Sequence, residues 1–236
     1  MNGLFVTGTD TGVGKTVVTA GIVCALRARG HSVGVAKSVQ SGALTLDPEG
    51  DAMMLKRWTK VAESPGEIAP FSFAAPLAPS VAAELEDRVV DRAELGDHLR
   101  AVASRYDAVV VEGAGGLLVP LGEDWTIADL AHDLALPLVV VARAGLGTVN
   151  HSALTVRVAR ELGLEPTGVV LNGPADDSTR ANARLIERVA DVRVLGHLPQ
   201  LDGELTGERL GRAIEDTIDV DVLEGVAIRQ REVAHV

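Results

Sequence analysis

A glycine-rich segment near the start of the chain has the residue types that hold a triphosphate. Residues 8–16 read Gly-Thr-Asp-Thr-Gly-Val-Gly-Lys-Thr, directly after an apolar run and before a helical pattern. In such a loop, backbone N–H groups surround the phosphates, a lysine neutralises β and γ oxygens, and a hydroxyl ligates magnesium. The standard spacing would put the first glycine at position 9, which is Thr9 here, so the loop is a variant. The nucleotide-binding candidates are Gly12, Val13, Gly14, Lys15, Thr16 and Val17.

Three further charged side chains stand where apolar runs or loops end. Lys37 and Glu112 each follow a short Val-rich run, and Asp51 opens a helical stretch after a long loop. From the residues alone, Lys37 could be an exposed lysine at the edge of the core, and Asp51 a helix N-cap. Glu112 is harder to explain structurally, because an unpaired carboxylate at the end of a buried strand is costly. All three are therefore candidates for a polar site.

The spacing of apolar residues predicts the elements that position these groups. Strands are expected at residues 4–6, 33–36, 108–111, 138–142, 168–171 and 192–195. Helices are expected at 15–29, 149–162 and 179–190, with a short one near 51–60. This alternation indicates an α/β fold over residues 1–236: a single-domain, doubly wound, mostly parallel sheet flanked by helices. The glycine-rich loop at residues 8–16 makes it a fold of P-loop NTPase type. Ligands of such sheets lie outside the carboxyl ends of the strands.

Some parts of the sequence are less informative. Residues 41–80 interrupt the alternation with many Pro and Gly residues, as a functional excursion or a poorly packed insertion. Residues 218–236 give no clear pattern. Cys24, the single cysteine, lies among apolar residues at helical spacing and is expected to be a buried core thiol without chemistry.

Composition excludes some partners. The net charge of −11 disfavours a nucleic-acid surface, which relies on Lys and Arg to neutralise phosphates. The apolar runs are shorter than the roughly 20 residues that cross a bilayer. The first residues lack the basic flank of a secretory signal. We expect a cytoplasmic protein that binds neither membranes nor nucleic acid.

Several segments together resemble the dethiobiotin synthetase family. The loop at 8–16 matches the family motif Gly-Thr-Asp-Thr-x-Val-Gly-Lys-Thr, and residues 37–42 match Lys-Pro-Val-x-Ser/Thr-Gly except that Ser38 replaces proline. Further matches are Gly50-Asp51-Ala52 and the segments 111–116 and 146–151. The resemblance spans about residues 3–201. Ser38 gives up the fixed φ of proline but spares the lysine and the hydroxyl of the motif.

This resemblance implies an ATP-dependent enzyme of biotin biosynthesis that requires Mg²⁺. It would join CO₂ to 7,8-diaminononanoate, activate the carbamate with the γ-phosphoryl group of ATP, and close a cyclic urea. Lys37 and Lys15 would be catalytic, on either side of the transferring group. Thr16, Asp51 and Glu112 would ligate the metal.

The same resemblance implies the other binding residues. The substrate would contact Thr11, Lys37, Ser41, Gly116, Gly147, Thr148, Val149 and Asn150. The nucleotide would also contact Asp51, Glu112, Gly113, Ala114, Gly115, Asn172, Gly173, Pro199, Gln200 and Leu201. For Asn172-Gly173, a purely structural turn fits the sequence equally well. In the family the helix that begins near residue 147 comes from the neighbouring subunit, so a homodimer with shared active sites is expected.

Two other classes share the P-loop. A partition or division ATPase, which acts as a nucleotide switch, carries a second lysine where this chain has Asp10. An amide ligase of the cobyrinate type normally needs a glutamine-hydrolysing module, for which the remaining residues leave no room. Both are therefore less consistent with the sequence than the synthetase.

Overall fold

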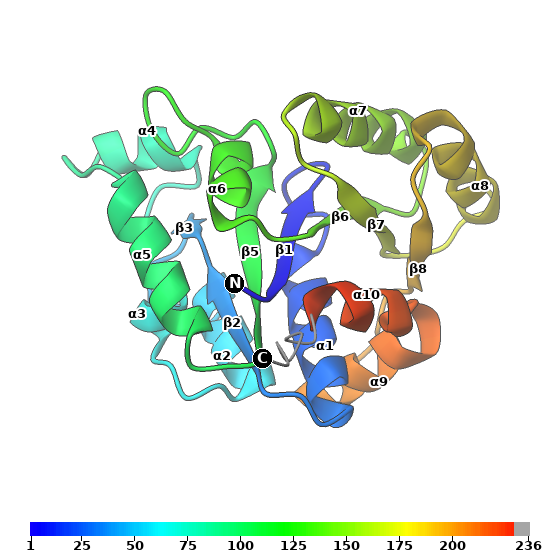
Figure 1. The fold of residues 1–236 in the computed structure, drawn as a ribbon, viewed down its shortest axis with the longest axis horizontal. Coiled ribbons are helices and arrows are strands. Elements are labelled where there is room, and N and C mark those ends of the chain that lie inside the picture. Colours follow the sequence, from blue (N-terminus) through cyan, green and yellow to red (C-terminus); the bar gives the residue numbers. More distant parts are fainter. Residues whose placement is uncertain (229–236) are drawn as a thin grey trace, which may run out of the picture.

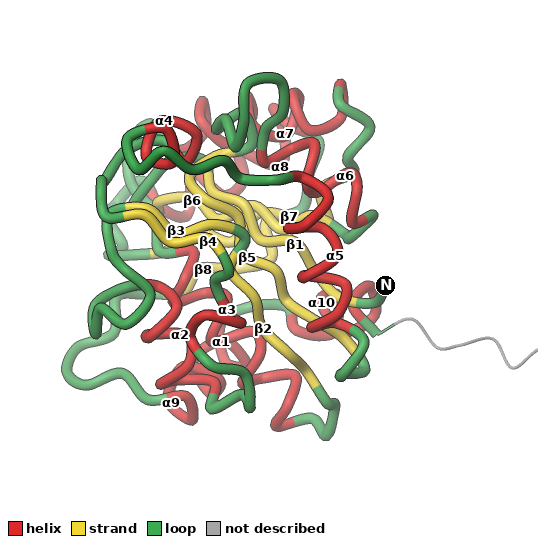
Figure 2. The backbone as a smooth tube through the Cα atoms, turned by 90° about the vertical axis from the view of Figure 1, so that its left-hand side faces the viewer, coloured by secondary structure: helices red, strands yellow, loops and turns green. Residues whose placement is uncertain are grey.

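A parallel sheet forms the middle of the molecule in the computed structural model, which describes residues 1–228 (Figure 1). Within these residues it has six strands in the order β2-β5-β1-β6-β7-β8, all neighbours pairing in parallel. The strands are β1 Gly3–Gly8, β2 Val33–Lys37, β5 Ala108–Gly116, β6 Leu138–Arg143, β7 Pro166–Asn172 and β8 Val194–Leu198. Figure 2 shows them twisting between helices on both sides. The expected α/β fold class is confirmed.

Helices cover the two faces of the sheet and create two apolar clusters. One face carries α5 Arg92–Ala103, α6 Ile127–Leu134, α7 Thr148–Glu161 and α8 Thr179–Ala190. The other carries α1 Lys15–Ala28, α2 Asp51–Thr59, α9 Gly207–Thr217 and α10 Val220–Ala227. Val110 and Val111 are both fully buried, in different clusters, because successive strand residues point to opposite faces. Strands buried on both faces explain the continuous valine runs.

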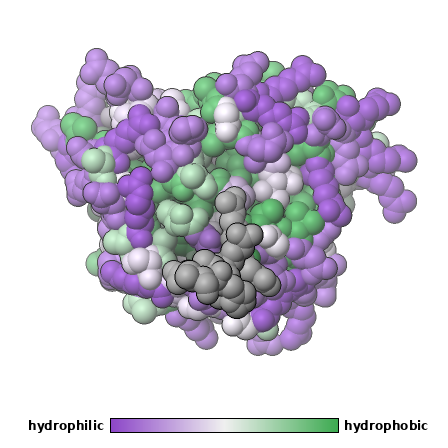
Figure 3. All heavy atoms as spheres, viewed as in Figure 1, coloured by the Kyte–Doolittle hydropathy of each residue, from purple (hydrophilic) through white to green (hydrophobic). Residues whose placement is uncertain are grey.

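The distribution of hydrophilic and apolar residues on the surface is consistent with this layering. On the face seen in Figure 3, hydrophilic residues cover most of the rim, and apolar residues gather toward the middle. No helix within residues 1–228 is long and apolar enough to cross a membrane.

The segment that interrupts the alternation folds around a second, two-stranded parallel sheet. Its strands are β3 Val39–Ser41 and β4 Phe71–Phe73, and its short helices are α3 Pro65–Ile68 and α4 Pro79–Glu84. Ile68 and Phe73 are fully buried. The alternative of a poorly packed insertion is therefore wrong.

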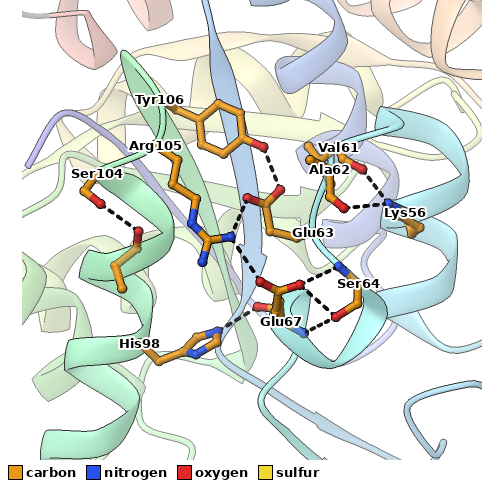
Figure 4. A network of polar contacts seen from close by, with 11 residues as sticks. Lys56, Val61, Ala62, Glu63, Ser64, Glu67, His98, Ser104, Arg105 and Tyr106 are labelled. Carbon is orange, nitrogen blue, oxygen red and sulfur yellow. Dashed lines mark hydrogen bonds and ion pairs between the residues drawn. The ribbon is translucent and has the colours of Figure 1, made fainter.

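A polar network ties this segment to α5 and to the turn between α5 and β5 (Figure 4). The buried carboxylate of Glu63 accepts a hydrogen bond of 2.6 Å from the hydroxyl of Tyr106. Arg105 Nη1 lies 3.3 Å from Glu63 Oε1 and 3.0 Å from Glu67 Oε1, and His98 Nε2 lies 2.7 Å from the carbonyl oxygen of Glu67. A buried carboxylate is tolerated only when it is paired, so these contacts fix the turn between α2 and α3 against its neighbours.

Most predicted element bounds agree with the structure within one or two residues. The strand predicted at 192–195 instead begins at Val194, where pairing with Val169 starts. Asp191 ends α8 in a left-handed conformation, with φ 49°, and the next two residues are used to turn the chain back. Helix α10 lies in the uninformative region 218–236, and residues 229–236 are outside the described part of the chain.

Cys24 differs from its prediction. It is only half-buried, with its thiol 3.7 Å from the carbonyl oxygen of Trp58. Gly207 and Gly211 of α9 lack Cβ atoms, so α9 approaches Cys24 closely without enclosing it. The expectation of a buried core thiol is therefore wrong. Partial burial still raises the pKa of the thiol.

Candidate active site

The glycine-rich loop connects β1 to α1 at the carboxyl edge of the sheet. Gly12 and Gly14 have φ angles of 74° and 89°, which residues with a Cβ rarely adopt. Gly14 is the N-cap of α1, and a Cβ there would lie 2.0 Å from Nδ2 of Asn172. The same amide donates a 2.9 Å hydrogen bond to the carbonyl oxygen of Val13. Asn172, at the end of β7, thus fixes the loop, which is a structural role.

Lys15 points back over the loop. Its ammonium donates to the carbonyl oxygen of Asp10 at 3.2 Å. Burial, reinforced by the nearby charge of Lys37, lowers the pKa of Lys15 to about 8. The Asp10 carboxylate accepts the N–H of Thr11 at 2.7 Å and pairs with Arg143 at the end of β6, also at 2.7 Å. The position that carries a lysine in partition ATPases is therefore an acid that forms an ion pair.

Lys37, Asp51, Glu112 and Thr16 form a single cluster. The Lys37 ammonium lies 2.6 Å from Oδ2 of Asp51 and 2.6 Å from Oε1 of Glu112. The Thr16 hydroxyl lies 2.8 Å from Oδ1 of Asp51 and 3.0 Å from Oε1 of Glu112. Lys37 is 3% exposed and Glu112 is fully buried, so the alternative of an exposed lysine is wrong. Asp51 is not an N-cap either: Gly50 occupies that position and α2 begins at Asp51.

Strand register explains how these residues meet. Lys37 and Glu112 are directly paired across β2 and β5. The next residue, Ser38, continues the ladder by donating its N–H to the carbonyl oxygen of Glu112 at 2.8 Å. Proline has no N–H and could not make this bond. Ser38 therefore makes a backbone hydrogen bond that the proline of the family motif cannot make, and it lacks the ring that fixes φ in that motif.

The charges in the cluster are strongly coupled. Burial alone would lower the pKa of Lys37, but the carboxylates of Glu112 and Asp51 outweigh it and raise that pKa. Burial would raise the pKa of Asp51, yet Lys37 and the Thr16 hydroxyl lower it overall. For the fully buried Glu112, burial outweighs Lys37 and its pKa is raised. Lys37 is therefore held as an ammonium ion between the two acids.

The donor set of this cluster fits Mg²⁺. Oε2 of Glu112 is buried and has no hydrogen-bond partner within residues 1–228. In the same part of the chain no group of three or more His, Cys, Asp or Glu residues could hold a metal by itself. Two carboxylates and one hydroxyl match Mg²⁺, which takes a few protein oxygens and completes its shell with phosphate oxygens and water. A metal-binding role for Thr16, Asp51 and Glu112 thus has chemical support.

A cavity of about 730 Å³ opens beside this cluster. It brings together the predicted site residues Thr11, Gly12, Gly14, Lys15, Thr16, Val17, Lys37, Ser41, Asp51, Glu112, Ala114 and Gly115. Sequence reasoning missed another part of its wall, formed by Val39, Met54, Pro76, Leu77, Ala78, Pro79 and Val119. The prolines belong to the irregular segment, whose composition marked a loop but not its position.

Other predicted residues lie outside this cavity. Gly147, Val149 and Asn150 line a separate groove of about 520 Å³ along α7, while Thr148 is buried. Residues 199–201 follow β8, and Gly173 donates its N–H to the carbonyl oxygen of Leu198. Val13 lies in the glycine-rich loop and Gly113 and Gly116 lie in β5, and none of the three lines the cavity. Gly113 is closely packed, since a Cβ there would lie 3.1 Å from both Phe5 and Ile127.

Comparisons with known proteins give consistent results. A sequence profile of the AAA domain family matches residues 2–209. The ATP-dependent dethiobiotin synthetase BioD of Bacillus licheniformis is 41% identical over 227 residues, covering 94% of this chain and 96% of the relative. The protein of the same name from Bacillus cereus is 42% identical over 237 residues, covering 99% and 98%.

Solved structures with a similar fold are more distant in sequence. The MinC:MinD cell division complex of Aquifex aeolicus has a TM-score of 0.59 at 16% identity, covering 98% of this chain and 99% of that one. A ParA family ATPase from Chlorobium tepidum has a TM-score of 0.53 at 14% identity, covering 97% and 98%. At this identity the likeness concerns the fold alone.

Proposed function

The chain belongs to the ATP-dependent dethiobiotin synthetase family, and we propose that it converts 7,8-diaminononanoate, CO₂ and ATP into dethiobiotin, ADP and phosphate. It is accordingly an ATP-dependent ligase that forms carbon–nitrogen bonds in biotin synthesis. The single observation that best supports the full reaction is the cluster of Lys37, Asp51, Glu112 and Thr16 beside the P-loop cavity.

The reaction would proceed in three steps. One amine of the diamine attacks CO₂ and loses a proton, giving a carbamate. A carbamate oxygen then attacks the γ-phosphorus of ATP, and ADP leaves, giving a carbamic-phosphoric anhydride. The second amine attacks the carbamate carbon, phosphate leaves, a proton is lost, and the ring closes. No enzyme nucleophile takes part, so the protein contributes orientation and charge stabilisation.

The two lysines would supply most of that stabilisation. Lys15 and Lys37 both line the cavity, and both are buried. In this low-dielectric setting, preorganised cations stabilise the negative charge that spreads over the transferring phosphoryl group. Lys15 would contact β and γ oxygens from the P-loop, and Lys37 would contact the carbamate and the γ-phosphoryl group from β2.

A magnesium ion would be held by Thr16, Asp51 and Glu112. When bound, Mg²⁺ neutralises charge on the phosphates during phosphoryl transfer. The orphaned Oε2 of Glu112 and the convergence of three oxygen-bearing side chains support this assignment. The chain's own contribution is to hold these side chains in place through strand pairing and the start of α2.

The diamine would occupy the part of the cavity near Ser41 and Thr11. Both residues line the cavity, and their hydroxyls can hydrogen-bond to amines or to a carbamate. Gly116 and the preceding glycines would bring backbone N–H groups near the substrate. Asn172, Gly173, Pro199, Gln200 and Leu201 would surround adenine, with Asn172 keeping its bond to the P-loop.

A homodimer would complete each site. The groove on α7 includes Gly147, Val149 and Asn150, and it is flanked by Leu146 and Leu154, which are 87% and 54% exposed. An apolar surface of this kind favours a protein partner. With a second copy on this face, the N-terminal N–H groups of α7 would bind the substrate carboxylate in the partner's site.

A nucleotide switch of the partition type is the competing function. The similarity to MinD and ParA proteins concerns the fold, and Asp10 pairs with Arg143 where those proteins need a lysine. Incubation with ¹³C-bicarbonate, the diamine, Mg²⁺ and ATP distinguishes the two by mass spectrometry. The proposed function requires a labelled cyclic urea, whereas unchanged diamine would refute it.

A further inference from the structure

One cation and three candidate metal ligands meet at the same point of the site. The cation is the ammonium of Lys37, which lies 2.6 Å from a carboxylate oxygen of Asp51 and 2.6 Å from one of Glu112. Thr16 bonds the same two acids from the first turn of α1. We propose that the Lys37 ammonium and Mg²⁺ compete for these carboxylate oxygens, so that metal binding releases Lys37 toward the substrate. This inference rests on the proposed function, and it gives Lys37 a second role as an internal counter-ion.

The sharing of oxygens makes simultaneous binding unfavourable. Lys37 already uses Oδ2 of Asp51 and Oε1 of Glu112, and Thr16 uses Oδ1 of Asp51. Oε2 of Glu112 remains, and it is the carboxylate oxygen of the cluster that has no partner within residues 1–228. A divalent cation placed among these oxygens would also be repelled by the adjacent ammonium. Full coordination by the protein therefore requires the ammonium to leave.

The counter-ion role has a structural reason. Glu112 is fully buried within β5, and Asp51 shares both Lys37 and Thr16 with it as partners. Two neighbouring carboxylates in a buried site repel each other and lose hydration unless a cation lies between them. Lys37 supplies that cation from the strand position paired with Glu112. The folded site thus already holds one cation between its two acids before any metal binds.

The cavity gives the displaced ammonium a destination. Lys37 lines it together with Ser41, Thr11 and Lys15. The aliphatic stem of lysine is flexible and carries a mobile charge. Displacement into this space would bring the ammonium to the proposed carbamate and γ-phosphoryl positions. Metal and nucleotide binding would then precede the use of Lys37 in catalysis.

Equilibrium binding of Mn²⁺ to the full chain without nucleotide, followed by electron paramagnetic resonance, tests the competition. Lys37→Met keeps the stem and removes the charge, and is expected to bind Mn²⁺ about tenfold tighter than wild type or better. Lys37→Gln, in case the first variant does not fold, should show the same gain. Adding Asp51→Asn to either variant should abolish it.

Lys15→Met is the matched control, because Lys15 lies in the same cavity but bonds the Asp10 carbonyl oxygen and neither acid. It should change Mn²⁺ affinity much less than Lys37→Met. The proposed competition would be overturned if both Lys37 variants bound Mn²⁺ no more tightly than wild type. It would also be overturned if Lys15→Met gained as much Mn²⁺ affinity as Lys37→Met. Formation of the cyclic urea by wild type is measured separately, so failure here would leave the proposed function standing.

Discussion

The side-chain oxygen of Gln40 accepts a 2.8 Å hydrogen bond from the backbone N–H of Ala52. Helix α2 needs this acceptor because its N-cap, Gly50, offers no side chain. The amide nitrogen of Gln40 donates to the carbonyl oxygens of Ala43 and Leu44, at 3.0 and 3.1 Å. A residue of β3 therefore caps α2 and holds the loop before it, which fixes Asp51 next to Thr16.

Gln40→Ala should weaken both the fold and the proposed metal site. Loss of buried hydrogen bonds to three backbone groups is expected to lower the free energy of unfolding by about 1–3 kcal/mol. It should also raise the Mg²⁺ concentration that gives half-maximal activity, because Asp51 loses its support. Thermal or urea unfolding and Mg²⁺ titration measure the two effects.

Tyr106→Phe is the control for that variant. It removes the 2.6 Å hydrogen bond to buried Glu63 at a place that contributes no side chain to the cavity (Figure 4). A comparable loss of stability with an unchanged Mg²⁺ requirement is expected. If both variants altered the Mg²⁺ requirement equally, Gln40 would have only a general effect on stability.

Glu112→Gln should nearly abolish synthesis while the protein stays folded. The amide removes the negative charge that faces Lys37 and the proposed metal, at a position that strand pairing keeps in place. Turnover is expected to fall by about a hundredfold or more. Steady-state assays at saturating Mg²⁺, with circular dichroism to check the fold, provide the test. Turnover near the wild-type value would remove Glu112 from the site.

Leu154→Glu should convert a dimer into monomers. Leu154 is 54% exposed and borders two adjoining surface grooves along α7, in the face proposed for the second copy. A buried charge there opposes association. Leu46→Glu is the matched control, since Leu46 is 71% exposed on the loop before α2. Sedimentation should show monomers for Leu154→Glu and a dimer for Leu46→Glu, and only Leu154→Glu should lose activity. A dimer in Leu154→Glu would contradict the proposed interface.

At alkaline pH, ATP binding should be accompanied by the uptake of a proton by Lys15. The pKa of Lys15 is about 8 in the ligand-free protein, below the ordinary 10.5. Phosphates stabilise the ammonium and raise this pKa again, so proton uptake should be near zero at pH 7 and grow above pH 8. Calorimetry in buffers of different ionisation enthalpy measures the uptake. Lys15→Arg, which stays charged, should show none.

The same shift has a defined sign for stability. Between about pH 8 and 10.5, the unfolded chain keeps the Lys15 proton that the folded protein has lost. Stability that depends on this lysine therefore rises with pH through that window. Below pH 8 the lysine is protonated in both states, and its burial remains a constant unfavourable contribution.

The sequence was most informative where local pattern and chemistry coincide. Strand and helix periodicity predicted the doubly wound sheet, and the family motifs predicted that Thr16, Asp51 and Glu112 would share one metal site. The structure brings these three side chains together with Lys37, because the first turns of α1 and α2 lie beside the paired strands β2 and β5. Their metal-binding role stays a prediction.

Other features depend on long-range packing that no local pattern encodes. Gln40, a strand residue, caps helix α2, and the pairing of β3 with β4 joins residues as far apart in the chain as Val39 and Phe71. The half-buried position of Cys24 follows from two glycines of α9 near the other end of the chain. The cavity wall at Pro76 to Pro79 likewise depends on how the irregular segment folds back. These contacts can be identified only from the tertiary structure.

Phosphate release from Mg²⁺-ATP, with bicarbonate and 7,8-diaminononanoate added separately and together, tests the central claim most directly. The account predicts release only when both are present, with one phosphate formed for each cyclic urea. Release that does not depend on the diamine, without a cyclic product, would contradict it and return the chain to the nucleotide-switch class.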